Sequence, residues 1–540
     1  MDLKILGLSQ HHNSSVCLVE NGDIKLHLDD ERVSGIKWNT DCFTALDYIH
    51  DNVDYVYVSG FSPNPDYNHN YQEYLLKKGK NFTYYNVWAH HHLFHASGSF
   101  YNSGFQKALC IIIDGMGSNY YLNEEPFTAG TYGREQRSSF VAEYPCQFTE
   151  IHKDVVVNFP YENKHGHVKV SNHISEALMF ELTCIKLGFN PLDAGKVMSL
   201  AAYGKKKDLH VIGNKNLYDF VDLRKPKFKE EVTVDNDFCF ELQKQSQESA
   251  LNYIKSMIEK TGIKKVCLSG GYFLNCVANN YIRENLDAEI YVEPIANDSG
   301  QSLGIAKYFW HSLTKDKTIR KQKSIYYGLN RKYQEEEIKN KFKPACLHFL
   351  GGPNPLDTYD VKKSNIKEIA HLIKEHKLVG VFGNRSESGP RALGNRSLLY
   401  NPTDPSGQDK VNEVKKRESF RPFACSILED KLNEYFSTDI KKSPYMMYAI
   451  KSISDKIPAV LHVDNTCRLQ TVSETDNKYF YDLIKSFEEL TNIPLVLNTS
   501  FNLGGKPIVE TLDDIKFTLE NSKLEYVYFY DSQMLVSKIF

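Results

Sequence analysis

A chain of 540 residues is longer than a single hydrophobic core usually supports, so we expect more than one domain. Its hydrophobic fraction of 41%, charged fraction of 25% and net charge of −3 are those of an ordinary soluble protein, and they argue against a general binder of nucleic acid or anionic membrane. No apolar run approaches the roughly 20 residues that cross a bilayer, and the first residues lack the apolar stretch of a signal peptide. We therefore expect a cytoplasmic protein whose 11 cysteines, none in a C-x-x-C pair, stay reduced.

Apolar runs at the start of the chain predict a sheet. Residues 3–9 and 15–19 predict two strands around a polar turn that contains His12. Asn21-Gly22-Asp23 predicts a tight hairpin into a third strand over residues 24–28. Residues 53–59 and 109–114 add two more apolar strands.

The segment before the last of these strands carries four histidines between residues 90 and 95. His91 and His95 are four residues apart, so a helix places both imidazoles on one face. Two such imidazoles can bind one divalent metal ion, and Asp114, at the end of the following strand, can complete the site. A helix with surface histidines beside an ordinary core strand would give the same pattern, so the residues alone leave both interpretations open.

Two glycine-containing loops follow strand-like runs. Ser269-Gly270-Gly271 precedes a helical run over residues 274–284, and the loop from Asp298 to Gly300 runs into another helix. Free backbone N–H groups at a helix N-terminus bind anionic phosphates well. The two loops together predict a nucleotide site, although a glycine turn also has a purely structural interpretation.

Residues 346–362 are rich in glycine and proline and predict a linker. A helix over 366–375 and a strand over 378–382 begin a second domain. Between residues 385 and 421, eight basic residues outnumber five acidic ones. Arginine on the Gly389-Pro390-Arg391 turn predicts an anion site, because guanidinium binds phosphate through two hydrogen bonds. A solvated basic helix over 410–417 is the alternative, but it does not explain the turn.

Two later stretches carry polar residues that a cleft would use. The stretch 458–470 alternates polar and apolar residues, and an apolar strand over 495–497 runs into a polar loop. The polar side chains concerned are His462, Asp464, Arg468 and Gln470 on the first stretch, and Asn498 and Ser500 on the second.

Together these stretches resemble the NodU/CmcH family of ATP-dependent O-carbamoyltransferases over nearly the whole chain. The most specific matches are Gly-Pro-Arg-Ala-Leu-Gly-Asn-Arg-Ser at 389–397 and Asn-Thr-Ser-Phe-Asn at 498–502. The others are His91-His92-x-x-His95-Ala, Asp114-Gly115, Gly195-Lys196-x-Met198, Ala202-Tyr203-Gly204, Ser269-Gly270-Gly271, Arg421-Pro-Phe-Ala424, His462-Val-Asp464 and Arg468-x-Gln470.

The resemblance implies an α/β protein with a duplicated actin-like (ASKHA-type) ATPase domain over 1–345, the linker over 346–362 and a YrdC-like α/β domain over 363–540. The YrdC-like domain would convert carbamoyl phosphate and ATP to carbamoyl-adenylate. The actin-like domain would pass the carbamoyl group to a hydroxyl of a small-molecule acceptor such as a sugar, an antibiotic or another natural product. In the family the metal is iron, although Zn or Mn would also suit these ligands. Mg is expected to accompany ATP. We expect no nucleic-acid or membrane partner, and a homodimer is compatible with the sequence.

The resemblance also implies roles for individual residues. His12 matches the general base for the acceptor hydroxyl, and Asp193 matches a residue that binds the acceptor. The implied metal ligands are His91, His95, Asp114 and Asp298. The residues expected to bind ATP or carbamoyl phosphate are Lys37, Gly270, Gly271, Asn275, Gly300, Arg391, Lys415, Arg421, Arg468, Asn498 and Ser500.

The chain departs from the family pattern at Asn13, Asn384, Cys425 and Lys506, where aspartate, glycine, proline and glutamate are usual, and this leaves the acceptor open. A hydrogenase-maturation carbamoyltransferase shares both domain types, but the sequence lacks its zinc-type C-x-x-C pairs and its N-terminal acylphosphatase domain. A threonylcarbamoyl-adenylate or tRNA-modifying fusion would need a basic face for the tRNA, and the sequence, with a net charge of −3, lacks an overall one. A non-catalytic actin-like nucleotide sensor is disfavoured, because candidates for the metal and phosphate residues all remain.

Overall fold

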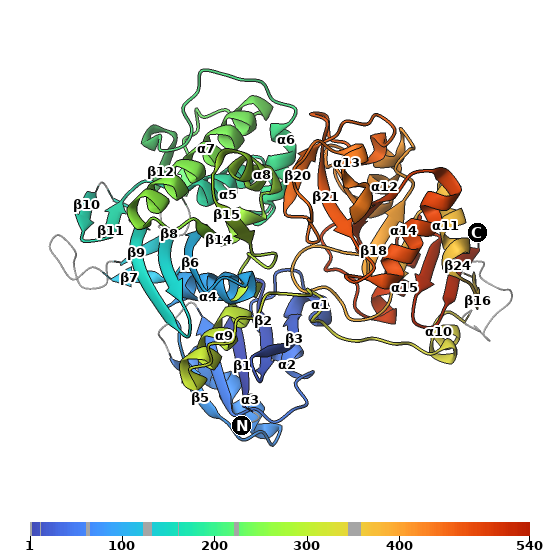
Figure 1. The fold of residues 1–540 in the computed structure, drawn as a ribbon, viewed down its shortest axis with the longest axis horizontal. Coiled ribbons are helices and arrows are strands. Elements are labelled where there is room, and N and C mark those ends of the chain that lie inside the picture. The colour runs from blue at the N-terminus through green and yellow to red at the C-terminus, as the bar shows by residue number, and fades with distance from the viewer. Residues whose placement is uncertain are drawn as a thin grey trace. The chain divides into compact units, whose positions relative to one another are not determined.

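The computed structural model describes residues 3–10, 12–60, 65–121, 132–159, 161–220, 226–343 and 358–539. The chain forms two compact units. The first consists of Met1–Asp30 and Trp38–Gln322, and the second of Glu31–Lys37 and Lys323–Phe540. In Figure 1 the colours run from blue to yellow-green along the first unit and from yellow to red along most of the second.

The described part of the first unit contains two large sheets and a two-stranded one, and the first large sheet is built at the start of the chain. Its strands, in the order β3-β2-β1-β4-β5, are β3 (Asp23–Asp29), β2 (Ser15–Glu20), β1 (Lys4–Gln10), β4 (Tyr55–Gly60) and β5 (Thr83–Asn86). Strands β1, β2 and β3 are antiparallel, whereas β4 and β5 run parallel to β1. The predicted strands and the hairpin at Asn21-Gly22 are confirmed, and both residues take positive φ angles, of 53° and 82°.

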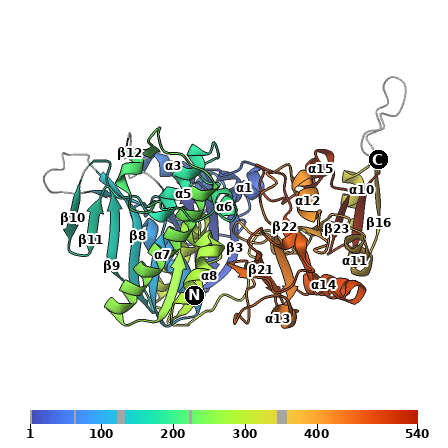
Figure 2. The ribbon, with the colours of Figure 1, turned by 90° about the horizontal axis from the view of Figure 1, so that it is seen from above.

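The second sheet repeats this topology. Strands β9 (Gln147–Val156), β8 (Tyr132–Glu143) and β6 (Lys107–Ile113) are antiparallel, and β14 (Lys265–Ser269) and β15 (Glu289–Val292) continue parallel to β6. The edge beyond β9 is extended by β11 (Val168–Ser171) and β10 (Glu162–His165), which Figure 2 shows side by side, and β7 (Asn119–Tyr121) pairs with β8. Two sheets with one strand order form the duplicated arrangement implied by the resemblance, and the predicted α/β class is confirmed.

Two helices connect the sheets and position the site described below. Helix α9 (Ser299–Thr314) packs on β1 and β2, helix α4 (His91–Ser103) packs on β6 and β14, and the two helices contact each other (Figure 1). Glycines allow these close approaches, because a Cβ atom at Gly304 would collide with the carbonyl oxygen of Phe94, and one at Gly7 with that of Ser302. Ser97 Oγ also donates to the Gly304 carbonyl oxygen over 2.8 Å.

The other elements of the first unit surround these layers. They are α2 (Phe43–Leu46), α3 (Pro65–Lys77), α5 (Glu176–Lys186), α6 (Ala194–Ala201), β12 (Tyr218–Phe220), β13 (Pro226–Phe228), α7 (Asn236–Thr261) and α8 (Cys276–Asn285), with α1 (Asp30–Ser34) running from the first unit into the second.

The second unit is built on one nine-stranded sheet with two buried faces. Its strands, in sheet order, are β16 (Thr358–Lys363), β24 (Met534–Ile539), β23 (Tyr526–Phe529), β17 (Val379–Phe382), β18 (Arg396–Tyr400), β22 (Leu495–Ser500), β19 (Ala424–Leu428), β21 (Thr466–Val472) and β20 (Tyr448–Lys451). Neighbouring residues of one strand enter different clusters, as Val381 and Phe382 do. One cluster includes residues of α11 (Ile366–Lys374) and α14 (Lys478–Thr491), and the other residues of α10 (Glu335–Lys341) and α15 (Leu512–Glu520). Helices α12 (Gly407–Lys415) and α13 (Leu432–Tyr435) complete the unit.

The observed division differs from the predicted boundaries at 345 and 363. Residues from Lys323 onward belong with the second unit, because Ile338 and Phe342 are buried in the same cluster as Ile515 and Leu519 of α15. Of the predicted linker, residues 346–357 lie outside the described residues, and its end is strand β16, which pairs with β24. The contacts that decide this boundary join segments more than 150 residues apart, so local composition does not reveal it.

Across the described ranges, none of the helices combines the length and apolar character that crossing a bilayer requires.

Candidate functional site

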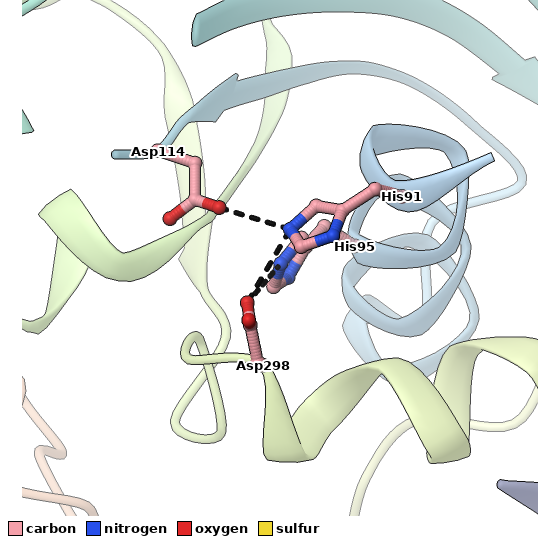
Figure 3. A group of neighbouring side chains, drawn as sticks. All are labelled: His91, His95, Asp114 and Asp298. Carbon is pink, nitrogen blue, oxygen red and sulfur yellow. Dashed lines mark hydrogen bonds and ion pairs between the residues drawn. The ribbon is translucent and has the colours of Figure 1, made fainter. Parts of the chain in front are cut away.

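The four predicted metal ligands lie together inside the first unit (Figure 3). His91 and His95 project from α4, Asp114 follows β6, and Asp298 immediately precedes α9. Their candidate ligand atoms all lie within 4.8 Å of one another, and all four side chains are buried. His91 Nε2 lies 2.9 Å from Asp114 Oδ2 and 3.3 Å from Asp298 Oδ1, and His95 Nε2 lies 3.4 Å from the same Asp298 oxygen. The four residues therefore form a group that could hold a metal ion.

Backbone contacts fix the orientation of Asp114. The N–H of Gly271 donates to Asp114 Oδ1 over 2.9 Å, which leaves Oδ2 directed at His91. Gly270 takes φ 97° and ψ 154°, a region that only glycine readily occupies, and a Cβ atom there would collide with the carbonyl oxygen of Ile113. The predicted glycine loop thus supports a candidate metal ligand, and one of its N–H groups is used for that purpose.

The electrostatics of this group favour a cation at its centre. Burial opposes protonation of His91, but the charges of Asp298 and Asp114 raise its pKa to about 10. Burial opposes ionisation of Asp114, but the hydrogen bond from His91 holds the pKa of Asp114 below its usual range. His95 Nε2 is buried and has no hydrogen-bond partner. Two imidazoles and two carboxylates, with the His95 Nε2 held only by its 3.4 Å ion pair to Asp298, fit a divalent metal, and this N/O donor set suits Fe(II), Zn or Mn.

His12 lies beside the same group. Its Nδ1 is 3.5 Å from Asp298 Oδ2, and its side chain is 40% exposed, so an imidazole accessible to solvent adjoins the buried cluster. The neighbouring Asn13 takes a φ of 67°, which asparagine tolerates better than most residues. The carboxylate that the family pattern places next to His12 in the sequence is absent, but Asp298 places a carboxylate beside it in space.

Glu181 of α5 is a further carboxylate at this site that the sequence did not predict. A Cβ atom at Gly115, next to Asp114, would collide with Glu181 Oε1. Burial, together with the charges of Asp114 and Asp298, raises the pKa of Glu181 to about 8. A single glutamate inside an amphipathic helix has no sequence signal that separates it from a surface residue.

The other predicted residues of the first unit have local structural contacts. Asn275 caps α8 by accepting from the N–H of Ala278 over 3.0 Å. Gly300, in the first turn of α9, leaves no room for a Cβ atom against the Ile295 carbonyl oxygen. Asp193 Oδ2 forms an ion pair of 2.9 Å with Lys196.

A second polar site lies in the second unit, around Lys415 at the end of α12. Lys415 Nζ is buried and donates to Ser500 and to both oxygens of Asn502, the latter two at 2.9 Å. Burial and the nearby guanidinium groups of Arg417 and Arg421 hold the Lys415 pKa well below its usual value. The pKa of Arg417 is also lowered, mainly by burial and then by the positive charges of Arg421 and Arg468. Like charges held this close favour an anion.

Arg417 is the residue of this cationic cluster that the sequence missed. Its Nε donates to Asn412 Oδ1 over 2.5 Å, and its guanidinium lies 4.2 Å from the ring centre of Phe423. Residues 410–417 had the alternative interpretation of a solvated helix. In the structure α12 ends at Lys415, whose side chain is buried, and Arg417 is half-buried against Asn412 and Phe423.

Buried polar groups adjoin Arg468 along β21 and β22. Asn498 Nδ2 donates to Ser426 Oγ over 2.9 Å and to Gln470 Oε1 over 3.1 Å, whereas Asn498 Oδ1 is buried without a hydrogen-bond partner. The remaining predicted residues of this unit are Arg391, half-buried on the loop before β18, Ser500, which accepts from Lys415, and Lys37, which forms an ion pair of 2.7 Å with Glu31.

Comparison with known proteins gives the family. Family models described as Carbamoyltransferase N-terminus and Carbamoyltransferase C-terminus match residues 210–307 and 370–538. The chain is 30% identical to protein MJ1051 of Methanocaldococcus jannaschii, over 94% of each chain, and 30% identical to Nodulation protein NolNO of Sinorhizobium fredii, over 81% of this chain and 62% of NolNO. Among solved structures, full-length HypF in a phosphate- and nucleotide-bound form is similar with a TM-score of 0.37 and 15% identity, over 58% of this chain and 47% of that one. The chain belongs to the NodU-type carbamoyltransferase family.

Proposed function

We propose that this protein is an ATP- and metal-dependent O-carbamoyltransferase that works in two steps. In the first, carbamoyl phosphate loses its phosphoryl group to water, and the carbamate oxygen attacks the α-phosphorus of ATP to give carbamoyl-adenylate and pyrophosphate. In the second, a hydroxyl of a small acceptor attacks the carbamoyl carbon, and AMP leaves. The carbamoyl-adenylate would form in the second unit and be consumed in the first.

One observation carries the proposal: His91, His95, Asp114 and Asp298, four residues from three separate parts of the sequence, come within 4.8 Å of one another. A metal bound there, which we propose to be Fe(II), would orient the adenylate phosphate and withdraw electron density from it. Zn and Mn remain compatible with the same donor atoms.

His12 is the proposed general base for the acceptor hydroxyl. Histidine is the most common general base in enzymes, and Asp298, 3.5 Å away, can orient the His12 ring. The 40% exposure of the side chain leaves room for an acceptor to approach it. Asp193 is proposed to contact that acceptor, whose chemical class is a small molecule with a free hydroxyl.

The cationic cluster of the second unit supports the adenylation step. Carbamate is a poor electrophile until it has a good leaving group, and the leaving pyrophosphate carries several negative charges that cations must stabilise. Lys415, Arg417, Arg421 and Arg468 supply such charges. The lowered pKa values of Lys415 and Arg417 reflect burial first and then repulsion from the neighbouring guanidinium groups. Mg accompanying ATP, a cytoplasmic location, a homodimer and the absence of nucleic-acid and membrane partners stay predictions.

Release of pyrophosphate tests the proposal. Purified protein, loaded with Fe(II) under anaerobic conditions, should release pyrophosphate only when ATP and carbamoyl phosphate are both present. Arg421→Ala should abolish the release, whereas Arg283→Ala, on α8 of the first unit, should leave it unchanged. A wild-type protein that binds ATP but releases no pyrophosphate would instead be the non-catalytic nucleotide sensor. Mass spectrometry of metabolite extracts, searching for a mass increase of one carbamoyl group, would then identify the acceptor.

A further inference from the structure

Glu387 is a buried carboxylate that no proposed step uses. It lies in the segment between β17 and β18, with 2% of its surface exposed. The loop that follows it, residues 388–395, carries Arg391 and connects directly to Arg396, the first residue of β18. Burying an acidic side chain costs free energy unless hydrogen bonds compensate it, so its partners indicate what it does.

One oxygen of Glu387 collects three N–H groups of this loop. Glu387 Oε1 accepts from Leu393 over 2.7 Å, from Asn395 over 2.9 Å and from Arg396 over 3.2 Å. Hydrogen bonds to a carboxylate are about twice as strong as those between neutral groups. Three of them on one atom fold the backbone of the loop around the carboxylate.

The same loop is connected to the cluster around Asn498. Leu393 donates its N–H to Glu387, and its carbonyl oxygen accepts from Tyr326 over 2.9 Å and from Gln470 Nε2 over 3.1 Å. The neighbouring Ala392 carbonyl accepts from Asn498 Nδ2 over 3.3 Å. The peptide groups at 392 and 393 are therefore fixed from both sides, between Glu387 and the polar groups on β21 and β22.

The beginning of the loop is fixed as well. Arg32, which belongs to the second unit, donates to the carbonyl oxygens of Gly389, over 2.9 Å, and Glu387, over 3.3 Å. Arg391 thus lies on a segment whose backbone is held before it by Arg32 and after it by Glu387. A loop held at both ends presents its side chain in one place.

We propose that Glu387 is a positioning residue: its carboxylate holds the 388–396 loop in the conformation that presents Arg391 to the phosphate substrate of the second unit. The inference rests on the proposed function, because Arg391 is there an anion-binding residue. Glutamine cannot replace Glu387 fully, since Oε2 is buried without a hydrogen-bond partner and an amide group at that position would bury an unpaired donor.

Two measurements on the full-length protein test this role. The first is pyrophosphate release, which gives kcat and KM for ATP and for carbamoyl phosphate in wild type, Glu387→Gln, Arg391→Ala and the double variant. The second is hydrogen exchange of a peptide covering residues 388–396, which reports opening of the loop without any activity. Asp404→Asn is the matched control: Asp404 is 7% exposed and accepts from the Ser406 N–H over 2.9 Å, from Tyr400 over 2.7 Å and from Lys410 over 2.8 Å, and none of these partners belongs to the 388–396 loop.

We expect Glu387→Gln to raise one of the two KM values about tenfold and to speed exchange of the loop peptide about tenfold, with a smaller change in kcat. In the Arg391→Ala background the same substitution should change that KM less than about twofold, because the side chain that it positions is gone. Asp404→Asn should leave both readouts at their wild-type values. Equal effects of Glu387→Gln in both backgrounds, or unchanged exchange in an active protein, would overturn the role of Glu387. Failure of wild type to release pyrophosphate would overturn the proposed function, and the exchange measurement would still decide whether Glu387 holds the loop.

Discussion

The ammonium group of Lys415 lies 2.9 Å from both the backbone carbonyl oxygen and the side-chain Oδ1 of Asn502. Asn502 is the last residue of the Asn-Thr-Ser-Phe-Asn motif, which begins inside β22, and Lys415 is the last residue of α12. Asn502 therefore fixes the position of a buried cation whose neighbours, Arg417 and Arg421, are also cationic. An anionic substrate would relieve the repulsion between them, so the arrangement is prepared for an anion before one binds.

The first prediction concerns the charge of Lys415. We expect Lys415→Met to lower kcat/KM for pyrophosphate release by about 100-fold or more, because removal of one pre-oriented donor at a site of developing charge typically costs that much. Lys410→Met is the control, since Lys410 lies on the same helix with a side chain that is 54% exposed. Rates of both variants within twofold of wild type would show that the cluster does not act on phosphate.

The second prediction concerns metal binding in the first unit. His95→Ala removes one of four candidate ligands and should lower metal affinity by at least about 100-fold. Substitution of a residue that only hydrogen-bonds to a ligand typically costs less than this. Elemental analysis after dialysis against a mild chelator would measure the loss of affinity. When the free metal concentration is 100 times the dissociation constant, binding should raise the free energy of unfolding of the wild-type protein by about 2.7 kcal/mol, which is seen as a higher Tm. His90→Ala, at the residue that precedes α4, should retain wild-type metal content. Equal metal loss in both variants would exclude His95 as a ligand.

Local patterns in the sequence predicted what local physics determines. The β1–β2–β3 hairpins follow from apolar alternation and from Asn21-Gly22, and the pairing of His91 with His95 follows from helix periodicity. Asp114 was predicted from its place at the end of the strand that follows the helix. Asp298 was assigned as a ligand through the family motifs, because nothing in the spacing brings a residue at 298 to one at 91.

What the sequence could not show depends on contacts between distant segments. The partial burial of Arg417 depends on Phe423 and Asn412, and the role of Glu387 depends on how the chain returns at residues 393–396. The same holds for the division between the units, which is decided by the burial of Ile338 against α15. Composition and periodicity carry no record of such pairings.

The third prediction concerns Gly270. A non-glycine residue there would be strained at φ 97° and ψ 154° and would also collide with the Ile113 carbonyl oxygen. We expect Gly270→Ala to lower the free energy of unfolding by about 2–5 kcal/mol, the sum of backbone strain and overpacking. Metal affinity should fall with it, because the adjacent Gly271 N–H orients Asp114.

Gly262→Ala is the control for Gly270. Gly262 also has a positive φ, of 70°, but nothing lies within 4 Å of the position of an added Cβ atom. Gly262→Ala should therefore lower the free energy of unfolding by only about 1 kcal/mol and leave the metal content unchanged. Urea denaturation and elemental analysis of both variants separate the two effects, and equal losses of stability would mean that the Ile113 contact is unimportant.

The fourth prediction concerns the pH dependence of stability through Lys307. This lysine of α9 is buried, its ammonium donates to the Gly22 carbonyl oxygen over 2.9 Å, and burial lowers its pKa to about 8. Because the folded pKa lies below the unfolded value of 10.5, the unfolded state binds the proton more tightly, and the charged lysine costs stability at neutral pH. That cost, about 3 kcal/mol from the size of the shift, is present below pH 8 and disappears as the pH rises toward 10.5.

Lys307→Met removes this titration, so its stability relative to wild type should be greatest at pH 7 and should decline by about 3 kcal/mol between pH 8 and 10.5. Urea denaturation of both proteins across this range measures the difference, and other titrating groups cancel between them. Lys107→Met is the control, because Lys107 has a side chain that is 51% exposed and should show no such decline. A constant difference between Lys307→Met and wild type would mean that Lys307 remains protonated throughout, because the Gly22 carbonyl and its surroundings solvate the ammonium group as well as water does.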